Sequence, residues 1–433
     1  MEKLRLHGHE AFFAGGWVRD FLLRRKPKDI DIATSALPDE VRRLFPNARP
    51  IGAQFGVVQV PIYGHTYEVA TFRSDDAYLD GRRPSSVTFS GPEQDALRRD
   101  FTVNGLFFDP LADRLIDYVH GRNDIQRRLI RTIGNPGERF AEDKLRMLRA
   151  IRLACDLGFT IVPETWKAIQ SLAPEILQVS WERIRDELTR ILTGPAPALG
   201  LDLLRDSGLL RQLLPEVEAM CGISHSDKES ATDVYSQTRA AITLLRKPGA
   251  ALAFGTLLHD VGKAAIWEQD AAEPIDRHAE VGARIAEDIC RRLKMSNEDT
   301  NRVADLVRAH VYFSKVMEMR ESALKRFLRK PGFSDHLELY RVNCLSSRRD
   351  LEIHAYILQK LEEYRDQLNA GLLISGDDLI RMGYSPGPAF REILQTVEDL
   401  QLEGTVRTRE EALEYVQSAF PLTGGSGSIE RPH

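Results

Sequence analysis

The sequence predicts an α+β protein, with a mixed head followed by an extended all-helical region. Residues 55–72 alternate apolar and polar side chains around Gly64-His65, a pattern typical of a β-hairpin. Residues 106–119 repeat this form, with two apolar runs on either side of Asp109-Pro110. After Arg139, apolar residues recur at helical spacing towards the C-terminus. Strands are therefore expected in the first part of the chain and helices in the rest.

The length of 433 residues exceeds what one hydrophobic core accommodates, and it suggests about three domains of ~150 residues. Pro195 and Pro197 indicate a break between helical units. The Gly- and Ser-rich end is expected to be flexible. The expected divisions are a head (1–130), a helical neck (131–196), a helical body (197–345), a helical tail (346–420) and a flexible C-terminus (421–433).

Composition indicates a cytoplasmic protein with no membrane partner. No apolar run approaches the ~18 residues of a membrane span, and the N-terminus lacks a signal-peptide pattern. The four cysteines are far apart and form no Cys-X-X-Cys pair, which argues against a disulfide framework and against a zinc site. These features fit a reducing compartment.

The net charge of −5 does not by itself indicate a nucleic-acid-binding protein. Between Arg98 and Arg152, however, twelve Lys and Arg residues stand against eight Asp and Glu residues. A local basic surface of this kind can hold a phosphate backbone. From charge alone, a solvated helix face is the favoured explanation of the pattern.

The first motif that carries chemistry is AGGWVRDFLLRRKPKDIDIAT (residues 14–34). Gly15 and Gly16 are expected to end a strand and open a helix from Trp17, so that the backbone can closely approach a triphosphate. Asp29 and Asp31 lie two residues apart on an expected strand, so both carboxylates project from one face.

Two adjacent carboxylates repel each other unless a cation lies between them. Mg²⁺ takes hard oxygen ligands and usually keeps phosphate oxygens in its shell. Two such ions can activate a 3′-hydroxyl and stabilise the leaving pyrophosphate. An isolated Asp-X-Asp also occurs in many solvated turns. The preceding Gly-Gly turn and helix favour a nucleotidyl-transfer site.

GGWVRD followed by KDIDIAT resembles the opening motif of class II tRNA nucleotidyltransferases and bacterial poly(A) polymerases, whose head has the polymerase-β-like nucleotidyltransferase fold. The resemblance extends from about Phe13 to Gln417. It implies that Asp29 and Asp31 are catalytic and bind two Mg²⁺ ions. It also implies nucleotide-binding roles for the residues Gly15, Gly16 and Arg19.

Two further features of the head are open to more than one interpretation. Glu68 is either a third carboxylate near the metals or an exposed strand residue. The segment TFRSDDAYLDGRRPSSVTF contains Asp80, Arg82 and Arg83. In the resembled family a similar stretch is a mobile loop needed for the switch to adding the terminal A, and its near-full length here favours an enzyme able to add A. A surface loop with no role is the alternative.

RRDFTVNGL (residues 98–106) is the next motif. The resemblance implies that Arg99, Asp100 and Asn104 contact the incoming nucleotide and its ribose, as a site selective for ribonucleotides requires. Gly105 stands where alanine is commoner in the family. The alternative is a capped helix start, with Asp100 as N-cap and both arginines solvated.

EDKLRMLRAIR (residues 142–152) predicts one helix on which Glu142, Arg146 and Arg149 recur on one face, with Asp143 three residues before Arg146. An Asp can accept a hydrogen bond from the amino group of C or A, and an Arg can donate to their ring acceptors, whereas U and G present the wrong pattern. In the resembled family this helix replaces a template. Base selection is therefore expected of Asp143 and Arg146, with Glu142 positioning them. An exposed amphipathic helix with ion pairs is the alternative.

LLHDVGK (residues 257–263) resembles the HD phosphohydrolase signature. His259, Asp260, His278 and His310 would supply ligands to a divalent metal. Gln237 stands where the first histidine is expected, and glutamine is a poor ligand for such an ion. The body is either an active phosphohydrolase that trims 2′,3′-cyclic phosphates or similar ends, or a scaffold with a degenerate HD site. The incomplete ligand set favours the scaffold.

These motifs together predict an enzyme that adds CCA to tRNA 3′ ends, with tRNA, ATP and CTP as partners and Mg²⁺ as cofactor. An A-adding tRNA nucleotidyltransferase and a poly(A) polymerase would share the same motifs. An HD-type phosphohydrolase with a vestigial head is a more remote alternative. The sequence leaves the oligomeric state open.

Overall fold

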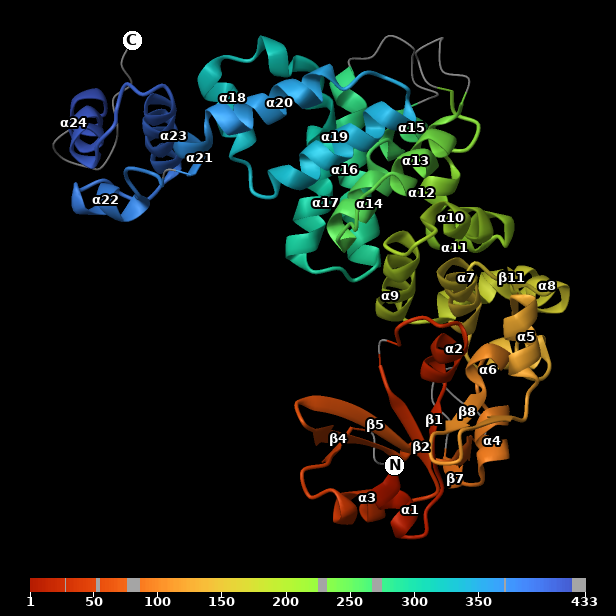
Figure 1. Ribbon diagram of the computed structural model, residues 1–433. Helices are drawn as coiled ribbons and strands as arrows, with labels where there is room; N and C mark the ends of the chain where they lie inside the picture. The colour runs from red at the N-terminus through yellow and green to blue at the C-terminus, as the bar shows by residue number, and fades with distance from the viewer. Residues whose placement is uncertain are drawn as a thin grey trace.

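The computed structural model describes residues 1–27, 29–51, 55–75, 86–224, 232–266, 275–369 and 371–422. These residues form a curved arrangement with the strands of the head at one end and helices α22–α24 at the other (Figure 1). None of the described helices has the length and apolar composition needed to cross a membrane.

The head is built on a seven-stranded sheet with the order β3-β4-β5-β2-β1-β8-β9. Strands β2 and β5 run parallel, and the other neighbours in this sheet run antiparallel. The strands are β1 Ala11–Ala14, β2 Asp31–Thr34, β3 Arg49–Pro50, β4 Val57–Ile62, β5 His65–Thr71, β8 Leu106–Asp109 and β9 Arg114–Asp117. Two small ladders pair β6 Arg73–Asp75 with β7 Val87–Phe89, and β10 Leu129–Ile130 with β11 Thr160–Ile161.

Both hairpins predicted from sequence are confirmed. β4 and β5 are joined by Tyr63 and Gly64, whose φ angles of 49° and 78° are those of a tight hairpin turn one residue earlier than expected. β8 and β9 turn around Asp109-Pro110, where the Asp109 carboxylate accepts hydrogen bonds from the backbone N–H groups of Leu111 and Ala112.

Helices cover the sheet because alternate strand residues are apolar on both faces. Ala11, Ile32 and Val69 belong to one apolar cluster, which includes residues of α1 and α3. Phe12 and Phe107 belong to a second cluster, which includes a residue of α4. The helices of this part are α1 Glu2–Leu6, α2 Gly16–Leu22, α3 Pro38–Leu44, α4 Pro92–Leu97, η2 Thr102–Asn104 and α5 Gly121–Arg127.

The helical region predicted after Arg139 is confirmed. Its first helices are α6 Pro136–Glu142, α7 Arg146–Leu157, α8 Pro163–Leu172, η3 Ala173–Gln178, α9 Trp181–Leu192, α10 Pro197–Asp206, α11 Leu209–Leu213, α12 Pro215–Glu218, α13 Val234–Thr243 and α14 Ala250–Leu258. They are followed by α15 Val261–Ile266, α16 Ile275–Arg292, α17 Asn297–Ala309, η4 His310–Glu318, α18 Glu321–Leu328, α19 Phe333–Ser346, α20 Glu352–Glu363, α21 Arg365–Asn369, α22 Gly376–Arg381, α23 Pro388–Leu402 and α24 Arg409–Ala419.

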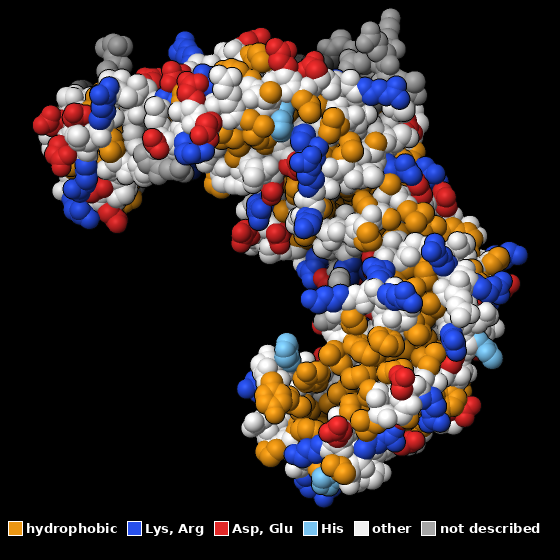
Figure 2. All heavy atoms as spheres, in the orientation of Figure 1, with side chains coloured by type: hydrophobic (Ala, Val, Ile, Leu, Met, Phe, Trp, Pro, Cys, Tyr) orange, Lys and Arg blue, Asp and Glu red, His pale blue; other side chains and the backbone are white. Residues whose placement is uncertain are grey.

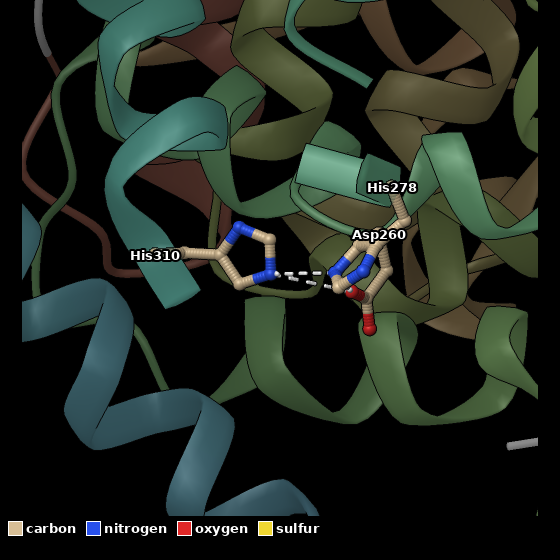
Figure 3. Close-up of side chains that lie close together, drawn as sticks. All are labelled: Asp260, His278 and His310. Carbon is tan, nitrogen blue, oxygen red and sulfur yellow. Dashed lines mark hydrogen bonds and ion pairs between the residues drawn. The ribbon is translucent and has the colours of Figure 1, made fainter. Parts of the chain in front are cut away.

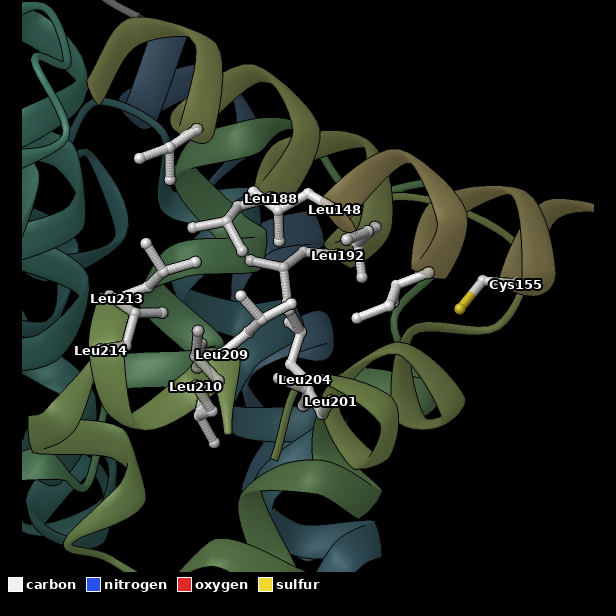
Figure 4. Packing of buried hydrophobic residues seen from close by; sticks show 14 of the residues in the cluster. Leu148, Cys155, Leu188, Leu192, Leu201, Leu204, Leu209, Leu210, Leu213 and Leu214 are labelled. Carbon is white, nitrogen blue, oxygen red and sulfur yellow. The ribbon is translucent and has the colours of Figure 1, made fainter. Parts of the chain in front are cut away.

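A leucine-rich core holds α7, α9, α10 and α11 together (Figure 4). Leu148, Leu188 and Leu204 are each at most 1% exposed, and they contribute to this core from three of these helices. The same cluster continues through α14 and α16, so helices 130–310 share one apolar interior. Residues 374–420 form a separate cluster of their own. The neck is thereby fixed to the body, which matters for the residues that it presents to the head.

Candidate functional site

Three carboxylates gather beside β2 in the head. β2 begins at Asp31, and the parallel pairing of β2 with β5 places Glu68 directly opposite it. Asp29 precedes the strand, so the expectation that both aspartates lie on it holds only for Asp31. All three residues are exposed to solvent. Glu68 is thus an exposed strand residue and also a neighbour of Asp31, which unites the two interpretations left open by the sequence.

The electrostatics of Asp31 reflect this crowding. Partial burial of its carboxyl, followed by the charge of Glu68, raises the pKa of Asp31 above its ordinary value. Asp29 acts in the same direction, and the positive charge of Arg99 opposes both. Carboxylates that resist being charged together gain the most from a cation. Their hard oxygen atoms fit a divalent ion such as Mg²⁺.

A glycine turn brings the start of α2 to this carboxylate cluster. Gly15, between β1 and α2, has φ 66° and ψ −131°, a conformation that side-chain-bearing residues rarely adopt. A Cβ atom on Gly15 would lie 3.1 Å from Nη1 of Arg99 and 3.7 Å from Oδ2 of Asp31. Gly15 therefore leaves room where the turn, the guanidinium and the carboxylate meet.

The nucleotide-binding residues expected in the head form one hydrogen-bonded network. Arg19 Nη1 donates to Asn104 Oδ1 at 2.7 Å, and Asn104 Nδ2 donates to Asp100 Oδ1 at 3.4 Å. Arg99 Nη1 donates to the carbonyl oxygen of Asn104 at 3.4 Å. The structure thus brings Arg19, Arg99, Asp100 and Asn104 together.

The alternative interpretation of this motif, a capped helix with solvated arginines, is wrong. The N-cap of η2 is Phe101, and the buried Asp100 carboxylate accepts from the Phe101 backbone N–H. Arg98 and Arg99 are not solvated, because both form ion pairs with the buried carboxylate of Asp95. Sequence reasoning did not find Asp95, since nothing in its local pattern separates it from other acidic residues in a first helical turn.

Gly105 has a packing explanation. A Cβ atom at this position would lie 2.6 Å from Cγ2 of Val119 and 3.0 Å from Cδ1 of Ile133. Such distances are too short for ordinary van der Waals contact. Glycine fits this chain because Val119 and Ile133 occupy the space that an alanine methyl would need.

The prediction of one continuous helix through EDKLRMLRAIR is wrong. α6 ends at Glu142 and α7 begins at Arg146, with Asp143 in an extended conformation between them (φ −148°, ψ 104°). The Asp143 carboxylate accepts from the Leu145 backbone N–H at 3.1 Å, a local bond that competes with helix formation. It also accepts two hydrogen bonds from Arg183 of α9, at 3.2 and 2.7 Å.

The two residues expected to select the base therefore have different partners. Arg146 Nη1 pairs with Glu142 Oε2 at 2.5 Å and donates to the carbonyl oxygen of Arg139 at 2.9 Å. Asp143 pairs instead with Arg183, which sequence reasoning missed because it lies 40 residues away in the chain. Both Asp143 and Arg146 are largely buried between α6, α7 and α9.

An ion pair joins the neck to the head at this point. Arg149 Nη2 of α7 lies 2.6 Å from Asp100 Oδ2. Burial would raise the pKa of Asp100, but the charges of Arg149 and Arg146 outweigh it and lower the pKa. The neck residues expected to read the base are thereby placed next to the head residues expected to hold the nucleotide.

Lys and Arg side chains also gather around the middle of the curved molecule in Figure 2. Asp80, Arg82 and Arg83 lie outside the described residues.

A second cluster lies in the body (Figure 3). Asp260 lies between α14 and α15, His278 is on α16 and His310 begins η4. His278 Nε2 is 3.2 Å from His310 Nε2, and Oδ1 of Asp260 is 3.6 and 3.5 Å from these two atoms. Each of the three residues offers one potential ligand atom, and these three atoms all lie within 4.8 Å of one another. Burial lowers the pKa of His278 to about 4, so its ring is neutral and can act as a metal ligand.

His259, also expected as a ligand, and Gln237, which stands in place of the first histidine, have other hydrogen-bond partners. His259 Nδ1 faces the carbonyl oxygen of Thr256 at 2.8 Å, and its Nε2 lies 3.3 Å from Asp260 Oδ2. Gln237 on α13 donates to Asn343 Oδ1 at 3.1 Å and to the Ser347 hydroxyl. The NH2 group of its side-chain amide therefore contacts the C-terminal end of α19.

Family models match most of the chain. The Poly A polymerase head domain matches residues 11–131, the RNA and SrmB-binding site of polymerase A matches residues 158–221, and tRNA nucleotidyltransferase domain 2 matches residues 278–416. A CCA-adding enzyme of Geobacillus sp. (strain WCH70) is 34% identical over 416 residues, which make up 95% of this chain and 94% of that enzyme. The chain belongs to the CCA-adding enzyme family. A CCA-adding enzyme of Geobacillus stearothermophilus is 46% identical over 210 residues, and the chain spans 52% of its length.

Solved structures of CCA-adding enzymes share the architecture. The Bacillus stearothermophilus CCA-adding enzyme in complex with CTP superposes with a TM-score of 0.68 at 29% identity, covering 96% of both chains. The Thermotoga maritima CCA-adding enzyme complexed with tRNA-CCA shares the fold with a TM-score of 0.55 at 19% identity, covering 96% of this chain and 92% of that one. The polymerase-β-like head and the helical C-terminal region expected from the motifs are confirmed for this family member.

Proposed function

We propose that this chain adds CCA to tRNA 3′ ends from CTP and ATP without a nucleic-acid template. The observation that carries the proposal is the Arg149–Asp100 ion pair at 2.6 Å, because it holds the Asp143–Arg146 segment of the neck against the head. Carboxylates that can bind metal ions, arginines that can bind a triphosphate and the Asp143–Arg146 pair that can read a base are then held in adjoining parts of the head and neck. The relatives' names and their complexes with CTP and tRNA-CCA support this assignment.

The residues of the head have separate roles in this proposal. Asp29, Asp31 and Glu68 would hold two Mg²⁺ ions, which supply activation of the tRNA 3′-hydroxyl and stabilisation of the leaving pyrophosphate. The Gly15-Gly16 turn lets the backbone approach the triphosphate, and the nearby arginines Arg19 and Arg99 neutralise its charge. The Asp100–Asn104 pair orients the ribose.

Base selection belongs to the neck. The Asp143 carboxylate, held by Arg183, accepts a hydrogen bond from the amino group of cytosine or adenine. Arg146, held by Glu142, donates to a ring acceptor. Uracil and guanine would instead present a carbonyl oxygen to the Asp143 carboxylate and a ring N–H to Arg146, and this mismatch of donors and acceptors rejects them. Arg149 couples this choice to the nucleotide held in the head.

The proposal includes a division of the chain into a head (1–130), a neck (131–196), a body (197–345), a tail (346–420) and a C-terminal segment (421–433). It also gives the segment with Asp80, Arg82 and Arg83 a role in A addition. We place the enzyme in the cytoplasm. All four cysteines are free thiols, which suits a reducing compartment.

Three RNA substrates separate the proposal from its relatives' activities. Purified protein is given a tRNA lacking CCA, a tRNA lacking only the terminal A, and an unrelated RNA, each with single labelled nucleotides. A CCA-adding enzyme incorporates CMP into the first tRNA and AMP into the second. Incorporation of AMP only into the second indicates an A-adding enzyme, and long A tracts on any RNA indicate a poly(A) polymerase.

For the body, we propose a scaffold that binds one divalent ion through Asp260, His278 and His310. A scaffold is favoured over a phosphohydrolase because the ligand set is incomplete: Gln237 stands where a histidine is expected, and glutamine is a poor ligand for such an ion. Metal analysis of the purified wild type and of Asp260→Asn tests the site, with the ion expected only in the wild type. Hydrolysis of 2′,3′-cyclic phosphates that survives Asp29→Ala and disappears in Asp260→Asn would reverse the assignment to a scaffold.

A further inference from the structure

A buried carboxylate binds Arg99, the arginine whose charge acts on Asp31. Asp95, on α4, is 1% exposed. Its Oδ1 accepts from Arg98 Nε and Nη2 at 2.8 and 2.6 Å, and its Oδ2 accepts from Arg99 Nε and Nη2 at 3.2 and 3.0 Å. One carboxylate therefore holds two guanidinium groups, each through two hydrogen bonds.

This arrangement fixes the direction of Arg99. Two of its three guanidinium nitrogens are bound by Asp95, and its Cζ atom lies over the Phe107 ring, 5.0 Å from the ring centroid. The remaining nitrogen, Nη1, is the one that lies 3.1 Å from the Cβ position of Gly15 and bonds the Asn104 carbonyl at 3.4 Å. Asp95 thus turns one specific N–H edge of Arg99 towards the Gly15 turn.

The charge balance points the same way. The guanidinium of Arg99 keeps its positive charge close to Asp31, whose pKa it lowers against the effect of the other neighbours. A positively charged edge that is already oriented can bind an anion without first losing side-chain freedom.

Asp95 also reaches the β6–β7 ladder. Its Oδ1 accepts from the Arg73 backbone N–H at 3.3 Å, and Arg98 Nε donates to the Arg73 carbonyl at 3.1 Å. The carboxylate that orients Arg99 is therefore anchored to the start of β6 as well as to α4. This second anchor restricts the movement of Asp95 itself.

We infer that Asp95 is a positioning residue for nucleotide binding, which acts by holding Arg99 with Nη1 directed at the triphosphate of the incoming nucleotide. The inference rests on the proposed function. Because the triphosphate is common to CTP and ATP, Asp95 affects both nucleotides equally, unlike the base-selecting residues of the neck.

The test compares Asp95→Asn with Asp109→Asn in the full-length enzyme. Asp109 is a matched control, because it is also 1% exposed, lies in the same sheet domain and pairs with Arg5 away from the carboxylate cluster. Loss of one oriented charge-assisted contact predicts that Asp95→Asn raises KM about tenfold for both CTP and ATP, with kcat changed less than about threefold. Asp109→Asn is expected to lower Tm and leave both KM values within about twofold. Equal KM values in Asp95→Asn and wild type would overturn the inference.

A double-mutant cycle with Arg99→Met establishes the route. If Asp95 acts through Arg99, adding Asp95→Asn to Arg99→Met produces no further rise in KM. Independent, additive effects would contradict the inference. If Asp95→Asn does not fold, Asp95→Glu serves instead, since it keeps the charge and displaces the carboxylate. Raised KM values for both nucleotides then support the inference, and unchanged values refute it. A wild type that incorporates no nucleotide would refute the proposed function itself, which is a distinguishable result.

Discussion

Arg183 of α9 donates two hydrogen bonds, of 3.2 and 2.7 Å, to the carboxylate of Asp143, which lies in the break between α6 and α7. The pair is largely shielded from solvent, with side-chain exposures of 20% and 12%. A bidentate pair that is shielded from solvent holds the orientation of its two side chains more firmly than a surface ion pair does. The position of the expected base-reading carboxylate is therefore set by α9 as well as by its own segment.

Replacing Arg183 with Met should loosen base selection. Freed from Arg183, the Asp143 carboxylate can rotate away from the amino group of C or A, so kcat/KM for CTP and ATP should fall about tenfold while UTP incorporation rises relative to CTP. Arg185→Met is the matched control on the same helix, because Arg185 pairs with Asp186 and the Lys294 carbonyl. An Arg183→Met enzyme with wild-type discrimination would show that Asp143 does not depend on this contact.

Replacing different carboxylates of the cluster should reduce activity to different extents. Asp31→Asn removes the carboxylate that faces both Glu68 and Gly15, and we expect nucleotide incorporation to fall about a thousandfold or more. Glu68→Gln should retain more activity, with a loss of about tenfold that higher Mg²⁺ concentrations partly restore. Single-turnover incorporation into a tRNA lacking CCA measures both. Near-normal rates for Asp31→Asn would remove the metal site from the account.

Gly105→Ala should destabilise the head through crowding. The added methyl would meet Val119 and Ile133 at less than normal contact distance, and overpacking of this kind typically costs about 1–3 kcal/mol. Val119→Ala in the same chain removes the nearest obstacle and should restore part of the loss. Thermal unfolding of the two single variants and the double variant provides the measurement. An unchanged Tm in Gly105→Ala would show that the backbone shifts to accommodate the methyl group without loss of stability.

The tail should lose stability in acid. A hydrogen bond from Arg409, followed by hydrogen bonds from Ser375, lowers the pKa of Asp378 to about 2. A folded-state pKa below the unfolded value stabilises the tail above the unfolded pKa, and that stabilisation is lost as pH falls through the folded pKa. Pepsin should therefore cleave Asp378→Asn faster than wild type in the tail at about pH 4, with the difference vanishing near about pH 2. A difference that persists at the lower pH would exclude this pair as its cause.

Local sequence pattern predicts those parts of the site that depend on neighbouring residues. The Gly15-Gly16 turn and the strand at Asp31 follow from glycine's conformational freedom and from β-branched, apolar alternation, and both are observed. Short-range preferences agree with the tertiary structure at these positions. The grouping of Asp260 with His278 and His310 is also observed, but it is expected from the resemblance to the HD signature, because these residues are far apart in the chain.

The remaining parts depend on contacts that are remote in sequence. Whether Glu68 is close to Asp31 is decided by the parallel register of β2 and β5, and no local pattern specifies that register. The helix break at Asp143 opposes the strong helical propensity of its neighbours, and it is stabilised by Arg183 from another helix. Asp95 is recognisable only when Arg98 and Arg99 are seen to converge on it.

A crystal structure of the enzyme with CTP and magnesium is the decisive measurement for the proposed site. We expect the triphosphate to lie against the Gly15 turn and Arg99, magnesium to be held by Asp29 and Asp31, and the cytosine amino group to contact Asp143. A nucleotide bound away from this acidic pair would show that the proposed site is wrong.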